Sequence, residues 1–485
     1  MTLNPYTIMD LRHAGTNVRA PFDVSLPGDA GTLSCQKLLR LLPGKRVVCD
    51  ASWNNKRVIA KLFVERKHFS KERDGLQALQ DAGISTPRIV AQFENGTGGL
   101  HIILIEYLKA AENLKMRLQT AVTGDENNGL LKRTMAILAA MHDAGLTQQD
   151  IHLDNFLVNA EGIHVIDGGA VCRHRQPLAK RTAADNLGKF FAQIEPLDDT
   201  VVRDIYSAYK RAGAPARGQV MKALVRRRRW RRRRYVKKTT RNCTEFIARR
   251  KWDRLIVYRR DHDSDEFTQF LEDPNRFMAT GTVLKSGNTA TVALMSIDGK
   301  QLVVKRYNIK HWRHALRRFW RPSRAWISWL NGHRLTFTGV STPTPVAVIE
   351  CRWGPLRGRA FYVSAYVDGD HLSDYVASLN NNNHPIIPGW LEQQVVTFFR
   401  MLSRERLSHG DMKANNLLLV NHRLSVIDLD SIRQHRYAWR WRRAFRRDLE
   451  RFLRNWEGRI GQHFDTLLRP MLSVGSQFNY RQRDK

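Results

Sequence analysis

Residues 407–419 read LSHGDMKANNLLL, and shortly after them residues 426–428 read VID. Within this stretch Asn416 follows Asp411 by five residues, and Asp428 follows Asn416 by twelve. Apolar runs typical of buried strands flank the polar residues. Taken alone, an Asp with an Asn five residues later is equally typical of a turn with a capping side chain. The interpretation therefore depends on whether the pattern recurs.

The pattern does recur in the first half of the chain. Residues 146–158 read LTQQDIHLDNFLV, where Asn155 follows Asp150 by five residues. Asp167 then follows Asn155 by twelve residues, as in the second half. Matching order and spacing in two halves indicates an internal duplication.

Two upstream features strengthen the duplication. The sequence GISTP at 83–87 corresponds to GVSTP at 339–343. Further upstream, an apolar run ends in a lysine in each half, at Lys61 and at Lys305. Each half therefore presents a lysine, then an Asp and Asn pair, then a second Asp.

These residue types suit phosphoryl transfer, which needs a cation on the nucleotide phosphates and a nucleophile held in line. A strand-borne lysine supplies the cation, so we assign nucleotide contacts to Lys61 and Lys305. Glu72 opens a helical pattern eleven residues past Lys61 and is placed to pair with it. Asp150 and Asp411 are placed to orient and deprotonate an acceptor hydroxyl.

The remaining polar residues are hard oxygen ligands of the kind that Mg²⁺ prefers. The predicted ligands are Asn155 with Asp167, and Asn416 with Asp428. Lys413, two residues after the second candidate base, is placed to reach the γ-phosphate. This ordered set resembles the protein-kinase signature of strand lysine, catalytic loop and DFG motif, which implies ATP and Mg²⁺ as cofactors.

Each half begins with strand-like runs, such as 58–64 and 301–307, and continues with helical periodicity, as at 130–142 and 391–404. A small sheet lobe followed by a helical lobe, occurring twice, predicts an α+β fold of two tandem bilobal protein-kinase-like domains. The expected organisation is a first kinase-like domain at 20–212, an Arg-rich linker at 213–250 and a second kinase-like domain at 251–485.

The second half also resembles the lipopolysaccharide kinase family, whose bacterial members phosphorylate Kdo or heptose in the inner core. The resemblance rests on residues 409–419, on VIDLD at 426–430, and on SWLNGHRL at 328–335 leading into 339–345. It implies a sugar hydroxyl as acceptor, on a nascent core glycolipid at the inner face of the cytoplasmic membrane.

The second copy departs from the pattern at one position. When the halves are aligned on Gly83 and Gly339, Ser328 stands where the first half has Glu72. Lys305 therefore lacks the obvious carboxylate partner.

The first copy departs at others. Gln148 stands where the second has His409, no lysine follows Asp150 by two residues, and Gly-Gly follows Asp167. Since the second loop has every element, we expect Asp411 to be the more important base. Two loop histidines, His152 and His409, are expected to be structural. One aspartate in each half, Asp185 and Asp448, is expected to open a helix.

The formal net charge of +34 implies an anionic partner, whether nucleic acid, an acidic lipid surface or a polyanionic substrate. Arginine interleaved with tryptophan is concentrated in three tracts: residues 226–234, 305–324 and 433–447. Because arginine pairs with phosphate and indole sits at the headgroup level, we expect these tracts to contact an anionic membrane surface. A solvated helix face is the alternative for the second and third tracts.

The composition, with 42% hydrophobic and 26% charged residues, fits a globular protein. Five scattered cysteines fit a reducing compartment. Neither a signal peptide nor a run of ~20 apolar residues is recognisable. We therefore expect a cytoplasmic protein, peripheral on the membrane.

Three functions compete: a sugar kinase of lipopolysaccharide core assembly, a membrane scaffold of two pseudokinase domains, and a RIO-like kinase associated with RNA. Both copies retain the base, the Asn and the metal Asp, which a scaffold would not need. The arginine run would suit RNA phosphates, but no RNA-binding motif is recognisable, so we expect no nucleic-acid partner. The sequence leaves open which sugar is the acceptor and whether both domains react.

Overall fold

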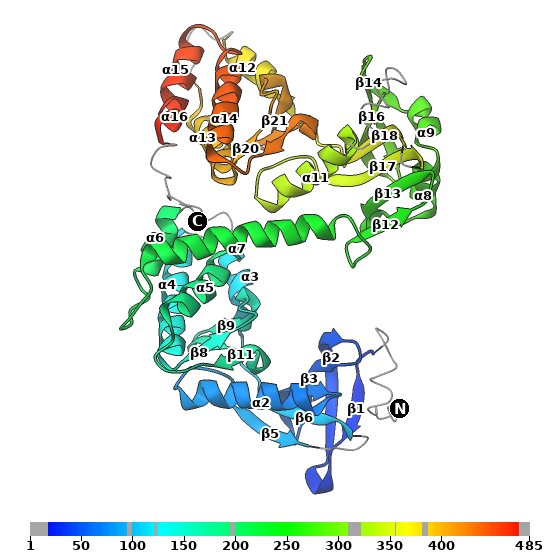
Figure 1. Cartoon of the computed structure of the whole chain (residues 1–485). Coiled ribbons are helices and arrows are strands. Elements are labelled where there is room, and N and C mark those ends of the chain that lie inside the picture. Colours follow the sequence, from blue (N-terminus) through cyan, green and yellow to red (C-terminus); the bar gives the residue numbers. More distant parts are fainter. Residues whose placement is uncertain are drawn as a thin grey trace. The chain divides into compact units, whose positions relative to one another are not determined.

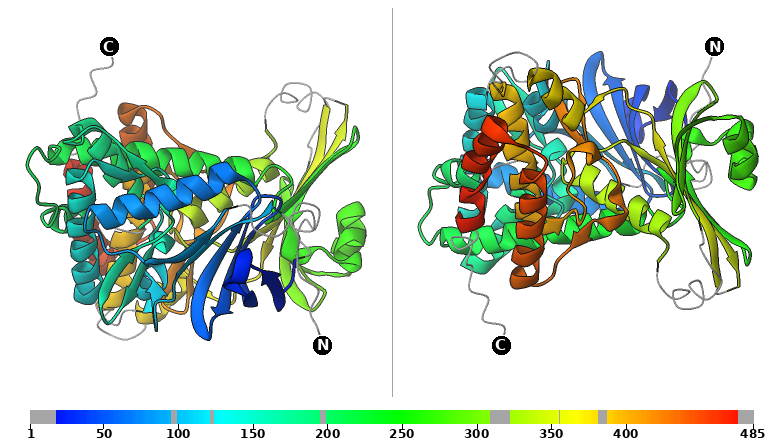
Figure 2. Two further views of the ribbon diagram at one scale, coloured as in Figure 1. Left: turned by 90° about the horizontal axis from the view of Figure 1, so that it is seen from below. Right: turned by 90° about the horizontal axis from the view of Figure 1, so that it is seen from above.

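The computed structural model describes residues 18–94, 99–120, 124–194, 199–308, 322–354, 356–380 and 387–474. The chain divides into two compact units, residues 1–229 (unit 1) and 230–485 (unit 2), shown in Figures 1 and 2. Each unit has its own sheet and its own helices. The α+β class and the pair of two-lobed domains are confirmed.

Unit 1 begins with an antiparallel sheet in the order β1-β2-β3-β4-β6-β5. Its strands are β1 (Phe22–Ser25), β2 (Thr32–Leu42), β3 (Arg46–Trp53), β4 (Lys56–Phe63), β5 (Ile89–Phe93) and β6 (His101–Glu106). In β4 the alternate residues Val58, Ala60 and Leu62 are buried on one face, as the two-residue period of a strand requires. Helix α2 (Arg66–Asp81) follows β4 and contacts β4 and β6.

The second lobe of unit 1 is mainly helical. Its helices are α3 (Leu114–Thr120), α4 (Gly124–Asp143), α5 (Lys180–Phe191), α6 (Asp199–Tyr206) and the start of α7 (Arg217–Lys238). Two small sheets carry the loops of interest, formed by β7 (Glu112–Asn113), β8 (Leu146–Gln148), β9 (Phe156–Asn159), β10 (Gly162–Val165) and β11 (Val171–Arg173). The apolar faces of these helices and strands share one core, which fixes the loops between the strands.

Unit 2 has a larger antiparallel sheet, ordered β12-β13-β17-β18-β16-β15-β14. Its strands are β12 (Phe246–Arg250), β13 (Arg254–Arg259), β14 (Thr282–Ser286), β15 (Ala290–Ile297), β16 (Lys300–Tyr307), β17 (Pro345–Trp353) and β18 (Leu356–Ala365). Helices α8 (Asp265–Glu272) and α9 (Pro274–Thr280) precede β14, and α11 (Arg324–Phe337) contacts β16, β17 and β18.

The helical lobe of unit 2 consists of α12 (Leu372–Asn380), α13 (Gly389–Glu405), α14 (Ala438–Leu453), α15 (Gly458–Leu468) and α16 (Pro470–Val474). Helices α13 to α15, drawn gold to red in Figures 1 and 2, pack together around Phe399, Phe452 and Phe464. Short strands again carry the loops: β19 (Asp370–His371), β20 (Leu407–Ser408), β21 (Leu417–Val420), β22 (Arg423–Val426) and β23 (Arg433–Gln434).

The stretch expected as a linker, 213–250, contributes structure to both units. It contains helix α7 and strand β12, and β12 pairs with β13 at the edge of the unit 2 sheet. In the part of α7 that belongs to unit 1, Arg226 and Arg227 form ion pairs with Asp185. In the part that belongs to unit 2, Arg232 forms one with Glu405. Arg226, Arg227 and Arg232 of the arginine run are therefore paired with carboxylates of their own units.

Three expectations about helix starts are wrong. Asp185 and Asp448 do not open helices, because α5 begins at Lys180 and α14 at Ala438. Glu72 does not open α2, which begins at Arg66. Buried residues before each aspartate, such as Ala183 and Phe445, extend the apolar face toward the N-terminus. None of the helices among the described residues is long and apolar enough to cross a membrane.

Candidate active sites

In unit 1 the predicted pair between Lys61 and Glu72 is present. Lys61 Nζ on β4 donates to Glu72 Oε1 on α2, and both side chains are buried. Glu72 also accepts the backbone amides of Gly168 at 3.2 Å and Gly169 at 3.0 Å. The carboxylate thus ties three elements together: the central strand, the helix and the segment that follows Asp167.

The Gly-Gly after Asp167 has a steric cause. Helix α2 approaches that segment so closely that a Cβ on Gly75 would lie 1.9 Å from the carbonyl oxygen of Gly168. A Cβ on Gly168 would in turn lie 2.6 Å from the backbone nitrogen of Leu76. A larger residue at 168, as in a DFG motif, would therefore overlap the backbone of helix α2 unless the helix moved.

A second cation reaches the same carboxylates in unit 1. Arg46, the first residue of β3, lies 3.4 Å from Glu72 Oε2 and 3.3 Å from Asp167 Oδ1. Burial would raise the pKa of Asp167, but the charges of Lys61 and Arg46 hold it below its ordinary value. Asp167 is therefore ionised at neutral pH, as a metal ligand must be.

The loop after β8 carries the candidate base of unit 1. Asn155 Nδ2 donates to the backbone carbonyl of Asp150 at 3.0 Å, and this bond holds the loop closed. Gln148, wholly buried, donates to the carbonyl of Ile166 at 2.7 Å. The carboxylate of Asp150 is exposed, and no ion pair joins it to any residue that the structure describes.

In unit 2 the lysine has different partners. Lys305 Nζ lies 2.5 Å from Asp428 Oδ1 and 3.5 Å from Asp430 Oδ2. Ser328, at the position of the missing Glu, is buried and shares a hydrogen bond of 2.9 Å with Tyr307 OH. Burial would raise the pKa of Asp428, but Lys305 holds it below its ordinary value.

The loop after β20 repeats the unit 1 loop with other side chains. His409 is buried and its Nε2 lies 3.1 Å from the carbonyl of Ile427, so it is a structural histidine, as predicted. Asp448 accepts the backbone amides of His409 at 2.5 Å and Gly410 at 2.9 Å. Asn416 Nδ2 donates to the carbonyl of Asp411 at 2.8 Å, as Asn155 does in unit 1.

His152, by contrast, is half-exposed at the matching loop of unit 1. Its Nδ1 lies 2.8 Å from Asp154 Oδ2, a residue of the same loop. The histidine is thus bonded within its loop, as expected.

The candidate base of unit 2 lies between two cations. Asp411 Oδ1 accepts Arg451 Nη1 at 2.8 Å and lies 3.5 Å from Lys413 Nζ. Arg451 also donates to the carbonyl of Gly410. Sequence reasoning missed Arg451, although its position three residues after Asp448 on α14 places both side chains on one helix face.

The donor set in each unit fits a magnesium ion with a nucleotide. In both loops the Asn nitrogen is committed to a backbone carbonyl, so its Oδ1 remains available beside the ionised aspartate. Among the described residues no cluster of three or more His, Cys, Asp or Glu could hold a metal. Two protein oxygens and phosphate oxygens are the arrangement that Mg²⁺ favours.

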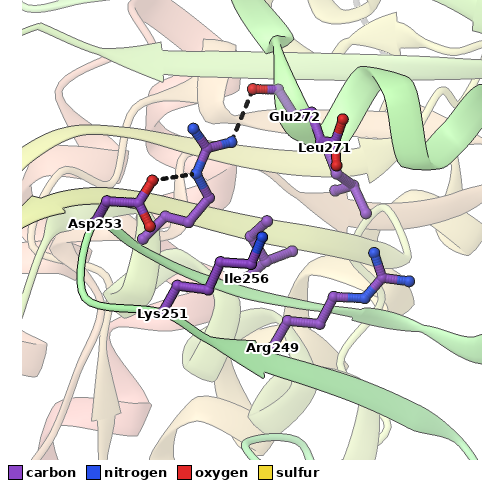
Figure 3. Close-up of a pocket in the computed structure, with 7 residues that line it drawn as sticks. Arg249, Lys251, Asp253, Ile256, Leu271 and Glu272 are labelled. Carbon is purple, nitrogen blue, oxygen red and sulfur yellow. Dashed lines mark hydrogen bonds and ion pairs between the residues drawn. The ribbon is translucent and has the colours of Figure 1, made fainter.

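A cavity of unit 2 lies elsewhere. It has a volume of about 230 Å³ and is lined by β12, β13 and α8, with Arg249, Lys251 and Arg254 around it (Figure 3). Arg254 is held by Asp253 and by the backbone carbonyl of Glu272. None of the predicted site residues lines this cavity, so we place the chemistry at the lysine and aspartate sites instead.

Two comparisons with known proteins gave matches. A family model described as the lipopolysaccharide kinase (Kdo/WaaP) family matches residues 54–208 and 276–468, which is more than half of the chain and includes the predicted residues of both units. The solved structure "WaaP in complex with acyl carrier protein" is similar at 21% identity, with a TM-score of 0.32, over 44% of this chain and 95% of that one. A search of the curated proteins gave no match.

Proposed function

This chain belongs to the lipopolysaccharide kinase (Kdo/WaaP) family, and on that premise we propose that it transfers the γ-phosphoryl group of ATP to an inner-core sugar, heptose or Kdo. Membership makes the chain a phosphotransferase of lipopolysaccharide biosynthesis. The observation that carries the finer proposal is the recurrence, in each unit, of a strand lysine paired with a carboxylate beside an Asp and Asn loop.

In the proposed reaction the sugar hydroxyl attacks the γ-phosphorus. Its proton passes to the carboxylate of Asp411 or Asp150, the new oxygen–phosphorus bond forms, and the bond to the β-phosphate oxygen breaks, releasing ADP. Lys305 and Lys61 hold the nucleotide phosphates. A bound Mg²⁺, held by Asn416 with Asp428 or by Asn155 with Asp167, would neutralise phosphate charge.

The test is mass spectrometry of the lipopolysaccharide core from cells with and without the gene. We expect one phosphate to be missing without the gene, and its position names the acceptor. Purified protein should also bind ATP with Mg²⁺ by isothermal titration. An intact core together with no nucleotide binding would favour the scaffold of two pseudokinase domains.

We further propose that the chain is peripheral on the cytoplasmic face of the membrane, and that the third basic tract makes the contact. Part of the second tract, 309–321, lies outside the described residues. The first tract is engaged in part, because Arg227 and Arg232 pair within their own units. Replacing the whole first tract would therefore disturb the fold as well as any surface contact.

The third tract keeps its charge exposed. Residues 433–447 contain seven arginines and no acidic residue. Trp439 is 62% exposed and Tyr437 48% exposed, while Trp441 and Phe445 point into the core. Arg440 lies over the rings of both exposed aromatics, which sets a cation and a ring side by side at one surface. An interfacial helix has this composition.

Vesicle binding tests this surface with a matched control. Replacing Arg436, Arg440 and Arg443 with Gln should weaken binding to phosphatidylglycerol vesicles on the order of 100-fold, at about 1 kcal/mol per basic residue. The control removes the same charge from β12 and its turn, by changing Arg249, Arg250 and Lys251 to Gln. Equal losses from both variants would mean that only net charge matters and that α14 is no dedicated contact.

A further inference from the structure

The two lysines occupy the same place in their sheets. Lys61 lies opposite Val48 on β3, and Lys305 lies opposite Val292 on β15. Each is on the strand that precedes the helix of its sheet lobe, α2 or α11. Their carboxylate partners nevertheless come from different elements, which invites a comparison position by position.

Two positions have exchanged their chemistry between the units. At the helix position unit 1 has Glu72 and unit 2 has Ser328. At the position two residues after the metal aspartate, unit 1 has Gly169 and unit 2 has Asp430. Unit 1 therefore has a carboxylate at the helix position and none at the loop position. Unit 2 has a carboxylate at the loop position and none at the helix position.

Space and hydrogen bonding make the two arrangements exclusive. In unit 1 the amide of Gly169 donates to Glu72, and a Cβ on Gly169 would lie 3.0 Å from that carboxylate. A carboxylate at 169 would therefore meet Glu72 directly. In unit 2 the short side chain of Ser328 bonds to Tyr307 and leaves that space to Asp430.

We propose that Asp430 is the positioning carboxylate of Lys305 in unit 2 and does from the loop what Glu72 does from the helix. This assignment rests on the proposed nucleotide site. The side chain of Asp430 is 2% exposed, and its Oδ2 lies 3.5 Å from Lys305 and 2.7 Å from Arg324. An aspartate buried to this extent requires cationic partners, and it has two.

Charge balance supports the same assignment. In unit 1, Lys61 and Arg46 face Glu72 and Asp167, two cations against two carboxylates. In unit 2, Lys305 and Arg324 face Asp428 and Asp430, with the same balance from other elements.

A metal-ligand role suits Asp430 less well. Asp428 is 35% exposed and so remains open to an ion, whereas Asp430 is closed off by two basic side chains. Lys305 Nζ lies nearer to Asp428, at 2.5 Å, than to Asp430, at 3.5 Å. Because Asp428 can reach solvent, we assign it as the ligand and assign the enclosed Asp430 to position the lysine.

The test measures binding of a fluorescent ATP analogue to the full chain. The unit 1 pair is first replaced, Lys61→Met with Glu72→Gln, so that unit 2 supplies the signal. In that background Asp430→Asn should weaken binding about tenfold to a hundredfold, because the ion pair between Asp430 and Lys305 is lost. Thermal unfolding of each variant checks that unit 2 stays folded, and Asp430→Glu should restore part of the affinity.

The decisive variant moves the carboxylate of unit 2 from the loop to the helix, which is the arrangement of unit 1. Ser328→Glu combined with Asp430→Gly should recover most of the affinity lost in Asp430→Gly alone, which a merely structural Asp430 would not allow. Unchanged binding by Asp430→Asn would overturn the assignment. So would a loss confined to the nucleotide with Mg²⁺ and absent without it, since that marks a metal ligand. If the parent protein binds no nucleotide, the proposed function itself fails, and this assignment with it.

Discussion

In each unit the helix of the sheet lobe, α2 or α11, contacts the segment that follows Asp167 or Asp428, but the contact differs between the units. In unit 1 two glycines, Gly75 and Gly168, let the backbones touch directly. In unit 2 Asn331 stands at the position of Gly75, and its Nδ2 donates to the carbonyls of Leu429 and Ile432, both at 2.9 Å. The direct backbone contact of unit 1 is therefore replaced in unit 2 by hydrogen bonds from a side chain.

The large and the small residue at this contact are also exchanged between helix and loop. Unit 1 has Leu76 facing Gly168, and unit 2 has Gly332 facing Leu429. A Cβ on Gly168 would lie 2.9 Å from Leu76 Cγ, and one on Gly332 would lie 3.3 Å from Leu429 Cδ1. In each unit one leucine fills the space between helix and loop. It comes from the helix in unit 1 and from the loop in unit 2. The two copies thus keep packed volume and charge balance while moving the residues that supply them.

The loops that carry Asp150 and Asp411 also differ in their side chains while keeping the same contacts. Gln148 and His409 differ in chemistry, yet each is buried and bonds to the carbonyl of the residue before the candidate metal ligand, Ile166 or Ile427. In unit 2 Asp448 accepts two loop amides, whereas in unit 1 Asn186 donates to the loop carbonyl of Gln148 at 2.7 Å. A departure from a motif therefore does not by itself mark a unit as inactive.

The largest expected difference between the units concerns the base. Asp411→Asn keeps the shape but removes the proton acceptor, so phosphate incorporation into purified core glycolipid should fall about 10²–10⁴-fold. Asp150→Asn should cost as much only if unit 1 reacts independently. Asp154→Asn, a neighbouring exposed aspartate, serves as the charge control. Full activity of Asp411→Asn with none in Asp150→Asn would reverse the assignment of the two units.

Acid should destabilise both units, and the largest contribution from a histidine in each unit comes from one that is buried. Burial lowers the pKa of His142 to about 4 in unit 1 and that of His333 to about 3 in unit 2. The unfolded chain binds a proton on each near pH 6.5, so stability falls by about 1.4 kcal/mol per pH unit below that value, down to the folded pKa.

Chemical denaturation at pH 7.5, 6 and 5 measures this loss. Single variants show how much of the loss belongs to each unit. His333→Phe should flatten the pH dependence of the unit 2 unfolding transition alone. A pH dependence unchanged by His333→Phe would show that other groups, such as carboxylates, control acid unfolding.

The smallest effect is expected at the glycine contact. Gly75→Ala should destabilise unit 1 by about 1–3 kcal/mol, because its Cβ would overlap the carbonyl of Gly168. Gly129→Ala on helix α4 meets no atom within 4 Å and should be neutral or slightly stabilising. Thermal unfolding distinguishes the two, and equal melting temperatures would mean that α2 can move aside without cost.

The sequence by itself determined the duplication, the fold class and the lysine, Asp and Asn residues of each copy. These follow from order and spacing along the chain, since a strand, a loop and the next strand carry them in fixed succession. The pairing of Lys61 with Glu72 was predictable for the same reason, because the helix starts directly after the strand.

Only the tertiary structure decided which other groups share each site. Arg46, Arg324 and Arg451 lie outside the spacing that defines the motif, and they reach it by packing of elements distant in the chain. Asp430 is adjacent to the motif, but its contacts with Lys305 and Arg324 come from packing. It also decided how much of the arginine run remains exposed, because pairing with Asp185 and Glu405 requires helices that are remote in sequence. A buried charge is compensated by whichever group lies within a few ångströms, and sequence separation does not report that distance.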